Sequence, residues 1–135
     1  DAAEGHYTSA PYFSTLPRAV NQSFVTAYRS AFGAHAPISA CTEAAYFQVH
    51  LFAEALKLGG PDAILQNLPL VEFDAPQGKV RVDRTTQHTF LTPRIGRVNP
   101  SGAFDIVYDH RSAVRPDPYK VEPEASGWSR FVGGA

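Results

Sequence analysis

"LVEFDAPQGKVRVD" (residues 70–83) is the stretch in which the hydrophobic pattern of this chain changes from a helical period to alternation. Two short runs, residues 70–73 and 79–83, alternate between apolar and polar side chains and flank a segment that contains proline and glycine. Alternation is typical of strands with one buried face, and Pro and Gly between two such runs favour a tight turn. We therefore predict a β-hairpin over residues 70–83.

A second hairpin is predicted immediately downstream. The runs "HTFLTPRIGRV" (88–98) and "AFDIVYD" (103–109) flank the tetrapeptide "NPSG" (99–102). Asn at the first position, Pro at the second and Gly at the fourth are the preferences of a type I turn. Within the last run, Asp105 and Asp109 alternate with apolar residues, so we expect these carboxylates on the outer face of the sheet.

Upstream of the hairpins, the patterns predict one strand and three helices, at residues 6–13, 17–33, 40–58 and 61–67. Ser39 is suited to cap the long helix at 40–58, whose wide apolar arc indicates a helix packed between other elements. The order strand, helix, helix, helix, hairpin, hairpin predicts a mixed α/β fold. We expect parallel pairing through the helical crossovers, supplemented by the antiparallel hairpins.

Composition limits the classes of function. The chain has 135 residues, of which 44% are hydrophobic and 19% charged, and its net charge is −1, as expected of one small domain. Its 12 Lys and Arg are scattered, which argues against direct nucleic-acid binding. No apolar run approaches the roughly 18 residues of a membrane span. The chain begins at Asp1 with neither Met nor a leader, so we expect a segment of a longer protein.

Few residues suggest catalysis. None of the five histidines lies three or four positions from another, so we predict no metal site and no cofactor. Cys41 opens the long predicted helix, and a helix N-terminus activates a thiol. A small α/β enzyme using Cys41, or Glu4 with His6, is therefore one hypothesis. A small buried apolar role for Cys41 is favoured over it, and Glu43 is sufficiently explained by the helix dipole.

Glu4 is the carboxylate best placed for binding. It precedes the first predicted strand and neighbours Gly5, which allows close approach to the backbone. Strand ends border the binding crevice in layered α/β domains, and a carboxylate accepts hydrogen bonds from amide or ammonium groups. A solvated loop position is the alternative, and the pattern leaves both open.

Several motifs together resemble one family. The segments are "EGHYTSAPYFS", "FVTAYRSAFG", "EAAYFQVHLFAEAL", "FDAPQGKVRVD", "HTFLTPRIGRV" and "RPDPY". In this order and spacing they resemble the C-terminal part of type I periplasmic-binding-fold proteins, over about residues 3–121. The chain is most similar to the amide-binding negative regulator of the aliphatic amidase operon and to the urea and short-chain-amide binding proteins of ABC transporters. Amide regulators tend to have a tryptophan where this sequence has Cys41.

The resemblance implies a two-lobed protein that closes on a small ligand by hinge motion and has no catalytic residues. The implied division is a second-lobe segment, a first-lobe segment and a second-lobe return with the C-terminal tail, at residues 1–37, 38–95 and 96–135. The implied hinge residues are Pro37, Ser39, Ile95 and Gly96. Since such a chain supplies pieces of both lobes, we expect exposed sheet edges and association with another copy, as a homo-oligomer or swapped dimer.

The same resemblance implies the ligand and the partners. Glu4, Tyr7 and Tyr12 are expected to face a small amide or urea, and a branched-chain or other amino acid is the alternative ligand. The implied partner is an ABC permease for a periplasmic receptor, or a regulatory protein for a cytoplasmic amidase-type sensor. Between these compartments the periplasm is favoured.

Overall fold

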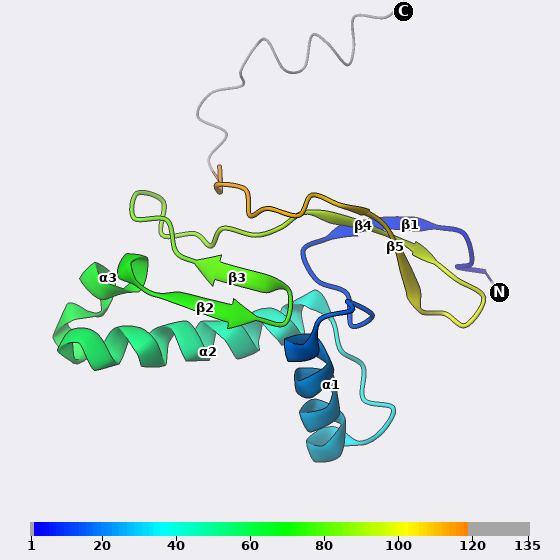
Figure 1. Cartoon of the computed structure of the whole chain (residues 1–135), viewed down its shortest axis with the longest axis horizontal. Helices are drawn as coiled ribbons and strands as arrows, with labels where there is room; N and C mark the ends of the chain where they lie inside the picture. Colours follow the sequence, from blue (N-terminus) through cyan, green and yellow to red (C-terminus); the bar gives the residue numbers. More distant parts are fainter. Residues whose placement is uncertain (1, 119–135) are drawn as a thin grey trace, which may run out of the picture.

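The computed structural model describes residues 2–118 and confirms a mixed α/β fold (Figure 1). Its helices are α1 (Ala19–Phe32), α2 (Ala40–Gly59) and α3 (Ile64–Asn67), with short 3-10 helices η1 (Pro61–Ala63) and η2 (Leu68–Leu70) on either side of α3. Its strands are β1 (Tyr7–Ala10), β2 (Glu72–Ala75), β3 (Gly78–Arg81), β4 (Arg94–Val98) and β5 (Phe104–Asp109). No helix in this part of the chain is long and apolar enough to cross a bilayer.

The strands form two separate sheets. The first has the order β1-β4-β5, and the second is the β2–β3 pair. Both predicted hairpins are confirmed, as β2–β3 and β4–β5. The expected parallel pairing is wrong, because every pair of described strands is antiparallel. A parallel crossover must return the chain to the sheet it left, whereas α1 and α2 lead from the first sheet to the second (Figure 1).

The long helix α2 begins as its sequence predicts. The Ser39 hydroxyl accepts a hydrogen bond from Thr42 N at 3.2 Å, and the Thr42 hydroxyl accepts one from Ser39 N. This reciprocal capping box satisfies two main-chain donors that a helix N-terminus leaves unpaired. At the other end, Gly60 adopts φ +73° and donates from its N–H to Leu56 O, which suits a glycine after a helix.

One face of α2 forms the larger hydrophobic cluster with the β2–β3 hairpin. The buried members of this cluster are Phe47, Leu51, Ala55, Val71, Ala75, Val80 and Val82. Within residues 2–118 the neighbouring helix face is uncovered, with Val49 69% and Phe52 48% exposed. The expectation of a helix packed on both sides is therefore met on one side only in the described part of the chain.

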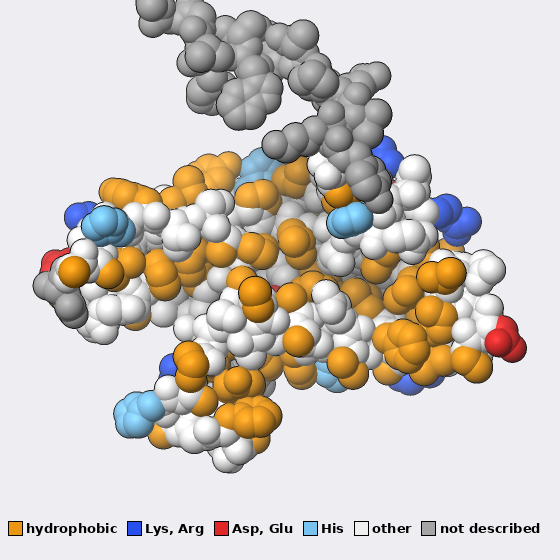
Figure 2. All heavy atoms as spheres, turned by 180° about the vertical axis from the view of Figure 1, so that it is seen from behind, with side chains coloured by type: hydrophobic (Ala, Val, Ile, Leu, Met, Phe, Trp, Pro, Cys, Tyr) orange, Lys and Arg blue, Asp and Glu red, His pale blue; other side chains and the backbone are white. Residues whose placement is uncertain are grey.

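A second, smaller cluster lies between β1 and α1. Tyr12, Leu16 and Phe24 are its buried members. The ring of Tyr46 on α2 lies 4.7 Å from that of Phe24 and 6.1 Å from that of Phe73 on β2, measured between centroids, so aromatic contacts join the two clusters. Figure 2 shows hydrophobic side chains gathered on the projection formed by α1.

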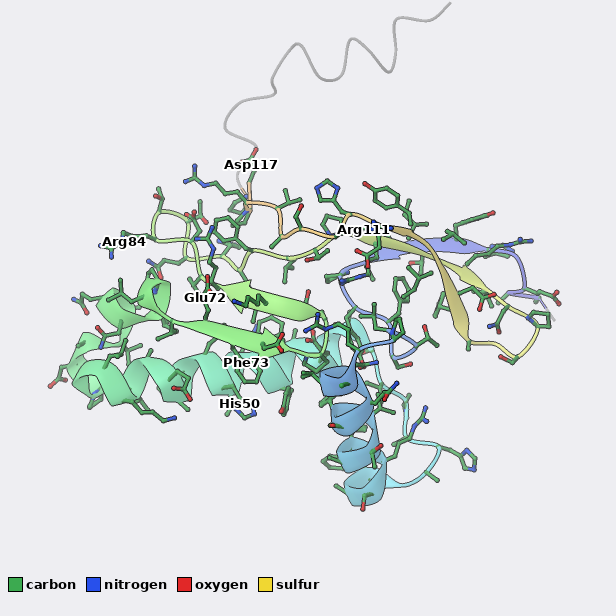
Figure 3. The ribbon with its side chains drawn as sticks, in the orientation of Figure 1. His50, Glu72, Phe73, Arg84, Arg111 and Asp117 are labelled. Atoms are coloured by element: carbon green, nitrogen blue, oxygen red, sulfur yellow. The ribbon has the colours of Figure 1, made fainter. Side chains whose placement is uncertain are left out.

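His50 on α2 extends this set of ring contacts to the surface of the helix. The rings of His50 on α2 and Phe73 on β2 are stacked, with centroids 4.6 Å apart and an interplanar angle of 3° (Figure 3). This stack fixes the hairpin against the middle of the helix, at the edge of the larger cluster.

Candidate ligand-binding cavity

A cavity of about 490 Å³ lies beside β1, where the first sheet meets α1 and the start of α2. Its walls come from β1 and the residues that follow it, from the last turns of α1, from the α1–α2 loop and from the β4–β5 turn. Four separate stretches of sequence therefore meet at one hollow, whose volume lies in the range typical of small-molecule sites.

Aromatic rings form one wall of this cavity. The rings of Phe13 and Phe104 lie 5.1 Å apart between centroids, and Tyr12 adjoins them. Gly96 lies directly behind Phe13, where an added Cβ would come within 2.7 Å of two ring carbons. A side chain at position 96 would displace Phe13, so glycine here has a packing role, in addition to the hinge role expected from the resemblance.

The polar lining of the cavity carries positive charge and hydroxyl groups. Arg29 and His35 supply nitrogen donors, and the hydroxyl-bearing lining residues are Thr8, Tyr12, Ser14, Ser39 and Ser101. Among residues 2–118, no Asp or Glu lines it. The first turn of α2 also opens at this wall, and a helix N-terminus favours negative charge.

Tyr12 lies in the cavity wall with its hydroxyl already engaged. The side chain is buried, and its hydroxyl donates to Asn21 Oδ1 at 2.8 Å. Asn21 in turn donates to the main-chain oxygens of Ser14 and Leu16. Burial, with the nearby Glu43, raises the pKa of Tyr12 far above its ordinary value, so the hydroxyl stays protonated. Tyr12 can therefore offer a ligand its ring rather than its hydroxyl proton.

The predicted site residues divide into two groups. Tyr12, Pro37 and Ser39 line the cavity, whereas Glu4, Tyr7, Ile95 and Gly96 do not. The expected trio of ligand-binding residues is thus not gathered at this hollow.

The two residues of the trio outside the cavity lie at the start of β1. Glu4 is exposed in the turn before the strand, where Gly5 adopts φ +83° and its N–H donates to Val98 O. Tyr7 is 65% exposed, and the Arg97 guanidinium lies 5.8 Å from its ring centroid.

The expected burial of Cys41 is wrong. Cys41 is exposed on the first turn of α2, because the buried row of that helix runs through Glu43, Phe47 and Leu51 instead. Within residues 2–118, no three His, Cys, Asp or Glu side chains are grouped so that they could hold a metal ion.

A buried polar junction lies behind the cavity wall, and the sequence analysis missed it. Glu43 is fully buried, with Oε1 accepting from Gln77 N at 3.3 Å and Oε2 from Gln77 Nε2 at 2.9 Å. Burial raises the pKa of Glu43 to about 7, although the hydrogen bonds from Gln77 and the charge of Arg94 oppose the shift. The sequence contains a signal for this burial, because Glu43 lies four residues before Phe47 and therefore on the same face of the helix.

Arg94 forms the other half of this junction. Its Nη2 donates to Gln77 O at 3.0 Å, and its Nη1 donates to Pro11 O. Its Nε lies 3.1 Å from Asp109 Oδ2 in an ion pair without hydrogen-bond alignment. One buried guanidinium thus joins β4 to the residues after β1, to the β2–β3 turn and to β5.

Comparison with known proteins identifies the family. The family model described as "Periplasmic binding protein domain" matches residues 1–125. The solute-binding protein of an ABC transporter from Rhodopseudomonas palustris BisB5, solved with 3,4-dihydroxy benzoic acid, is 27% identical with a TM-score of 0.75, over 87% of this chain and 33% of that chain. An ABC transporter substrate-binding protein from Desulfitobacterium hafniense, solved with Leu, is 27% identical with a TM-score of 0.64, over 78% of this chain and 32% of that one.

A curated relative, the limonene hydroxylase of Geobacillus stearothermophilus, is 31% identical over 121 residues, which are 87% of this chain and 22% of the relative. The chain thus spans about a third of these solved structures and less than a quarter of this relative. The match over residues 1–125, together with the shared fold, shows that the chain belongs to the periplasmic binding protein domain family.

Proposed function

We propose that this chain is part of a solute-binding protein of an ABC transporter and that a small-molecule ligand occupies the cavity beside β1. The observation that carries the proposal is the combination in one hollow of an aromatic wall, Phe13 and Phe104, with the cationic side chain of Arg29. Pockets of this kind hold a ligand by apolar contact and orient it with a few polar groups. The corresponding partner is a membrane permease, and the corresponding compartment is the periplasm.

The resemblance to amide regulators favours a short-chain amide or urea as the ligand. In that proposal the Glu4 carboxylate accepts hydrogen bonds from the ligand NH₂, with Tyr7 at the same end of β1, whereas Tyr12, the third expected residue, lies in the cavity wall. Glu4 lies outside the cavity lining, so this ligand requires a site at the start of β1. If the chain acts as the amidase regulators do, the protein is a cytoplasmic amide sensor whose partner is a regulatory protein.

A carboxylate ligand is the second candidate, favoured by the charge of the cavity. Arg29 and His35 line it, and no carboxylate of the described residues does, so an anionic ligand would meet a cationic side chain without a repelling one. The dihydroxybenzoate and the leucine named with the two solved relatives both carry a carboxyl group. The aromatic wall of the cavity suits the ring of a benzoate.

The division into lobes is also a proposal. The larger hydrophobic cluster and the residues packed on it come from positions 44–91, whereas the three-stranded sheet comes from both sides of that range. This separation supports a first-lobe segment at 38–95, with crossings near Ser39 and Ile95. The uncovered apolar side chains of α2, Val49 and Phe52, are consistent with burial by another part of the polypeptide or by a second copy.

Calorimetric titration of the full-length polypeptide tests the ligand. The probes are acetamide, urea, leucine and benzoate, each at neutral pH. Saturable binding of benzoate or leucine supports the carboxylate form, and binding of acetamide or urea supports the amide form. If none of the four binds, the ligand assignment loses its support. Glu4→Gln discriminates further, since it should weaken an amide bound at β1 and leave a benzoate bound in the cavity unaffected.

A further inference from the structure

The position of the cavity wall depends on a contact behind it. Residues 10, 12 and 13 line the cavity, and Pro11, which lies between them, offers its main-chain oxygen to Arg94 Nη1 on the opposite side. Arg94 is only 5% exposed, and its Nη2 holds Gln77 O in the β2–β3 turn. The guanidinium is therefore a rigid spacer between the ligand cavity and the second sheet.

Gln77 connects this spacer to Glu43. Both the main-chain and the side-chain N–H groups of Gln77 donate to the Glu43 carboxylate, while its main-chain oxygen accepts from Arg94. Its side-chain oxygen, Oε1, is buried and has no hydrogen-bond partner among the described residues. When Glu43 is protonated, its carboxyl group needs an acceptor for the new proton. If the side-chain amide of Gln77 rotates by about 180°, its unpartnered Oε1 becomes that acceptor.

We propose that Arg94 is a positioning residue for the ligand cavity and that Glu43, through Gln77, makes this positioning sensitive to protonation. Ionised Glu43 holds the Gln77 amide in the observed orientation. Protonated Glu43 favours the rotated Gln77 amide, in which Nε2 loses its acceptor. The β2–β3 turn, to which Arg94 donates a hydrogen bond, is then held less firmly. The inference rests on the proposed function, because it assigns Arg94 a role in binding the ligand.

The groups around Glu43 support a transition near neutral pH. Arg94 of β4 faces it and stabilises the carboxylate, whereas Tyr12, from the segment after β1, is close enough to interact with it and is itself influenced by Arg29 of α1. Burial acts against the carboxylate and raises the pKa of Glu43 to about 7. A change of pH from 8 to 6 therefore moves Glu43 from mostly ionised to mostly protonated.

The first test is ligand affinity in the full-length polypeptide, with benzoate as the probe because it stays ionised from pH 6 to 8. Arg94→Met should weaken binding about tenfold or more, as expected for loss of a charged hydrogen bond, and Arg94→Lys should lie between it and the wild type. Wild-type affinity should fall from pH 8 to pH 6. Glu43→Gln, whose side chain is neutral at both pH values like protonated Glu43, should bind equally at pH 8 and pH 6, and as weakly as the wild type at pH 6. Both proteins are also compared with His35 replaced by Gln, so that the imidazole in the cavity lining cannot account for a difference between them.

The second test needs no ligand. Amide hydrogen exchange at Tyr12 and Phe13 should become faster in Arg94→Met, and in the wild type it should increase from pH 8 to pH 6 after correction for intrinsic exchange. In Glu43→Gln this increase should be absent. Unchanged exchange in Arg94→Met, or an equal pH response in Glu43→Gln, would overturn the positioning role. Wild-type protein that binds no benzoate contradicts the carboxylate form of the proposed function instead, and the exchange data then decide the role of Arg94 alone.

Discussion

Arg94 Nη2 donates a hydrogen bond of 3.0 Å to the main-chain oxygen of Gln77, and this contact joins the three-stranded sheet to the β2–β3 turn. The donor is charged and buried, so the bond is stronger than a neutral one and costly to break. Glu43 holds the other side of Gln77 through two further hydrogen bonds. The two sheets are therefore tied by a polar junction as well as by the apolar clusters.

Glu43 should make stability depend on pH between about 4.5 and 7. Its pKa is raised by burial from 4.5 to about 7, so the folded state holds the proton more tightly than the unfolded state. The stabilisation is fully present below pH 4.5 and is lost as the pH rises through 7. Glu43→Gln should remove this slope, making the variant more stable than the wild type at pH 8 by up to about 3 kcal/mol.

Urea unfolding at pH 5, 6, 7 and 8 measures that slope. The matched control is Glu54→Gln on the solvent side of α2, where the carboxylate is 44% exposed and pairs with Lys57; this variant should keep the wild-type pH dependence. A Glu43→Gln profile as steep as that of the wild type would contradict the assignment of this proton to Glu43.

Asp83 should contribute in the opposite direction in acid. Hydrogen bonds from Thr86 and Thr85, with the Arg115 guanidinium, lower its pKa to about 2 although burial opposes them. The stabilisation is present above pH 3.8 and is lost as the pH falls towards 2. Asp83→Asn should be less stable at neutral pH and should flatten the acid limb in circular-dichroism titration, while exposed Asp62→Asn should follow the wild type.

Gly96→Ala should destabilise the fold through the cavity wall. The new methyl group would meet the Phe13 ring at 2.7 Å, and overpacking of this kind costs about 1–3 kcal/mol. Chemical denaturation measures the loss. Phe13→Leu in the same chain should recover part of this loss. In a double-mutant cycle, the double variant should therefore be more stable than the sum of the two single effects predicts. Strictly additive effects would mean that Phe13 is not the group that meets the new side chain.

Asn21→Ala should be among the more damaging single substitutions in α1. It removes the acceptor of the Tyr12 hydroxyl and the donor to Ser14 O and Leu16 O, all in or beside the smaller cluster. Leaving buried polar groups unpaired costs about 2–3 kcal/mol. Gln22→Ala, on the exposed face one residue further on, should change the free energy of unfolding by less than about 0.5 kcal/mol. Equal losses in both variants would contradict a structural role for Asn21.

The sequence predicts the local elements well because their signals are local. The Asn-Pro-Ser-Gly turn fixes the β4–β5 hairpin, with Asn99 Oδ1 accepting from Ser101 N and Ala103 N. Ser39 likewise caps α2 through atoms three residues away. Such chemistry depends on neighbouring residues alone, so it can be predicted before the tertiary structure is known.

The orientation of β4 could not be predicted in the same way. Alternation in "RIGRV" favours Ile95 inside and Arg94 outside, but Ile95 is 37% exposed and Arg94 is buried. The reason lies in the tertiary structure. Arg94 donates hydrogen bonds to Pro11 O and Gln77 O and pairs with Asp109, and none of these residues neighbours it in sequence. The pairing of β1 with β4 escaped prediction for the same reason, since it depends on distant segments.

The cavity itself is also a tertiary feature. Arg29 and His35 belong to the end of α1 and the loop after it, and no motif links them to Phe104 on β5. The resemblance implies a ligand at Glu4, Tyr7 and Tyr12, and of these three Tyr12 alone lines the cavity. The structure adds an alternative with the opposite charge, and binding measurements discriminate between the two.

The most direct test of the central claim, that the cavity beside β1 binds the ligand, is the affinity of Arg29→Gln for benzoate by isothermal titration calorimetry in the full-length polypeptide. Arg84→Gln is the matched control, since Arg84 is exposed in the β3–β4 loop and outside the cavity lining (Figure 3). The account predicts saturable wild-type binding, a loss of about tenfold or more in Arg29→Gln, and no change in Arg84→Gln. Absence of benzoate binding in the wild type, or equal affinities in both variants, would contradict it.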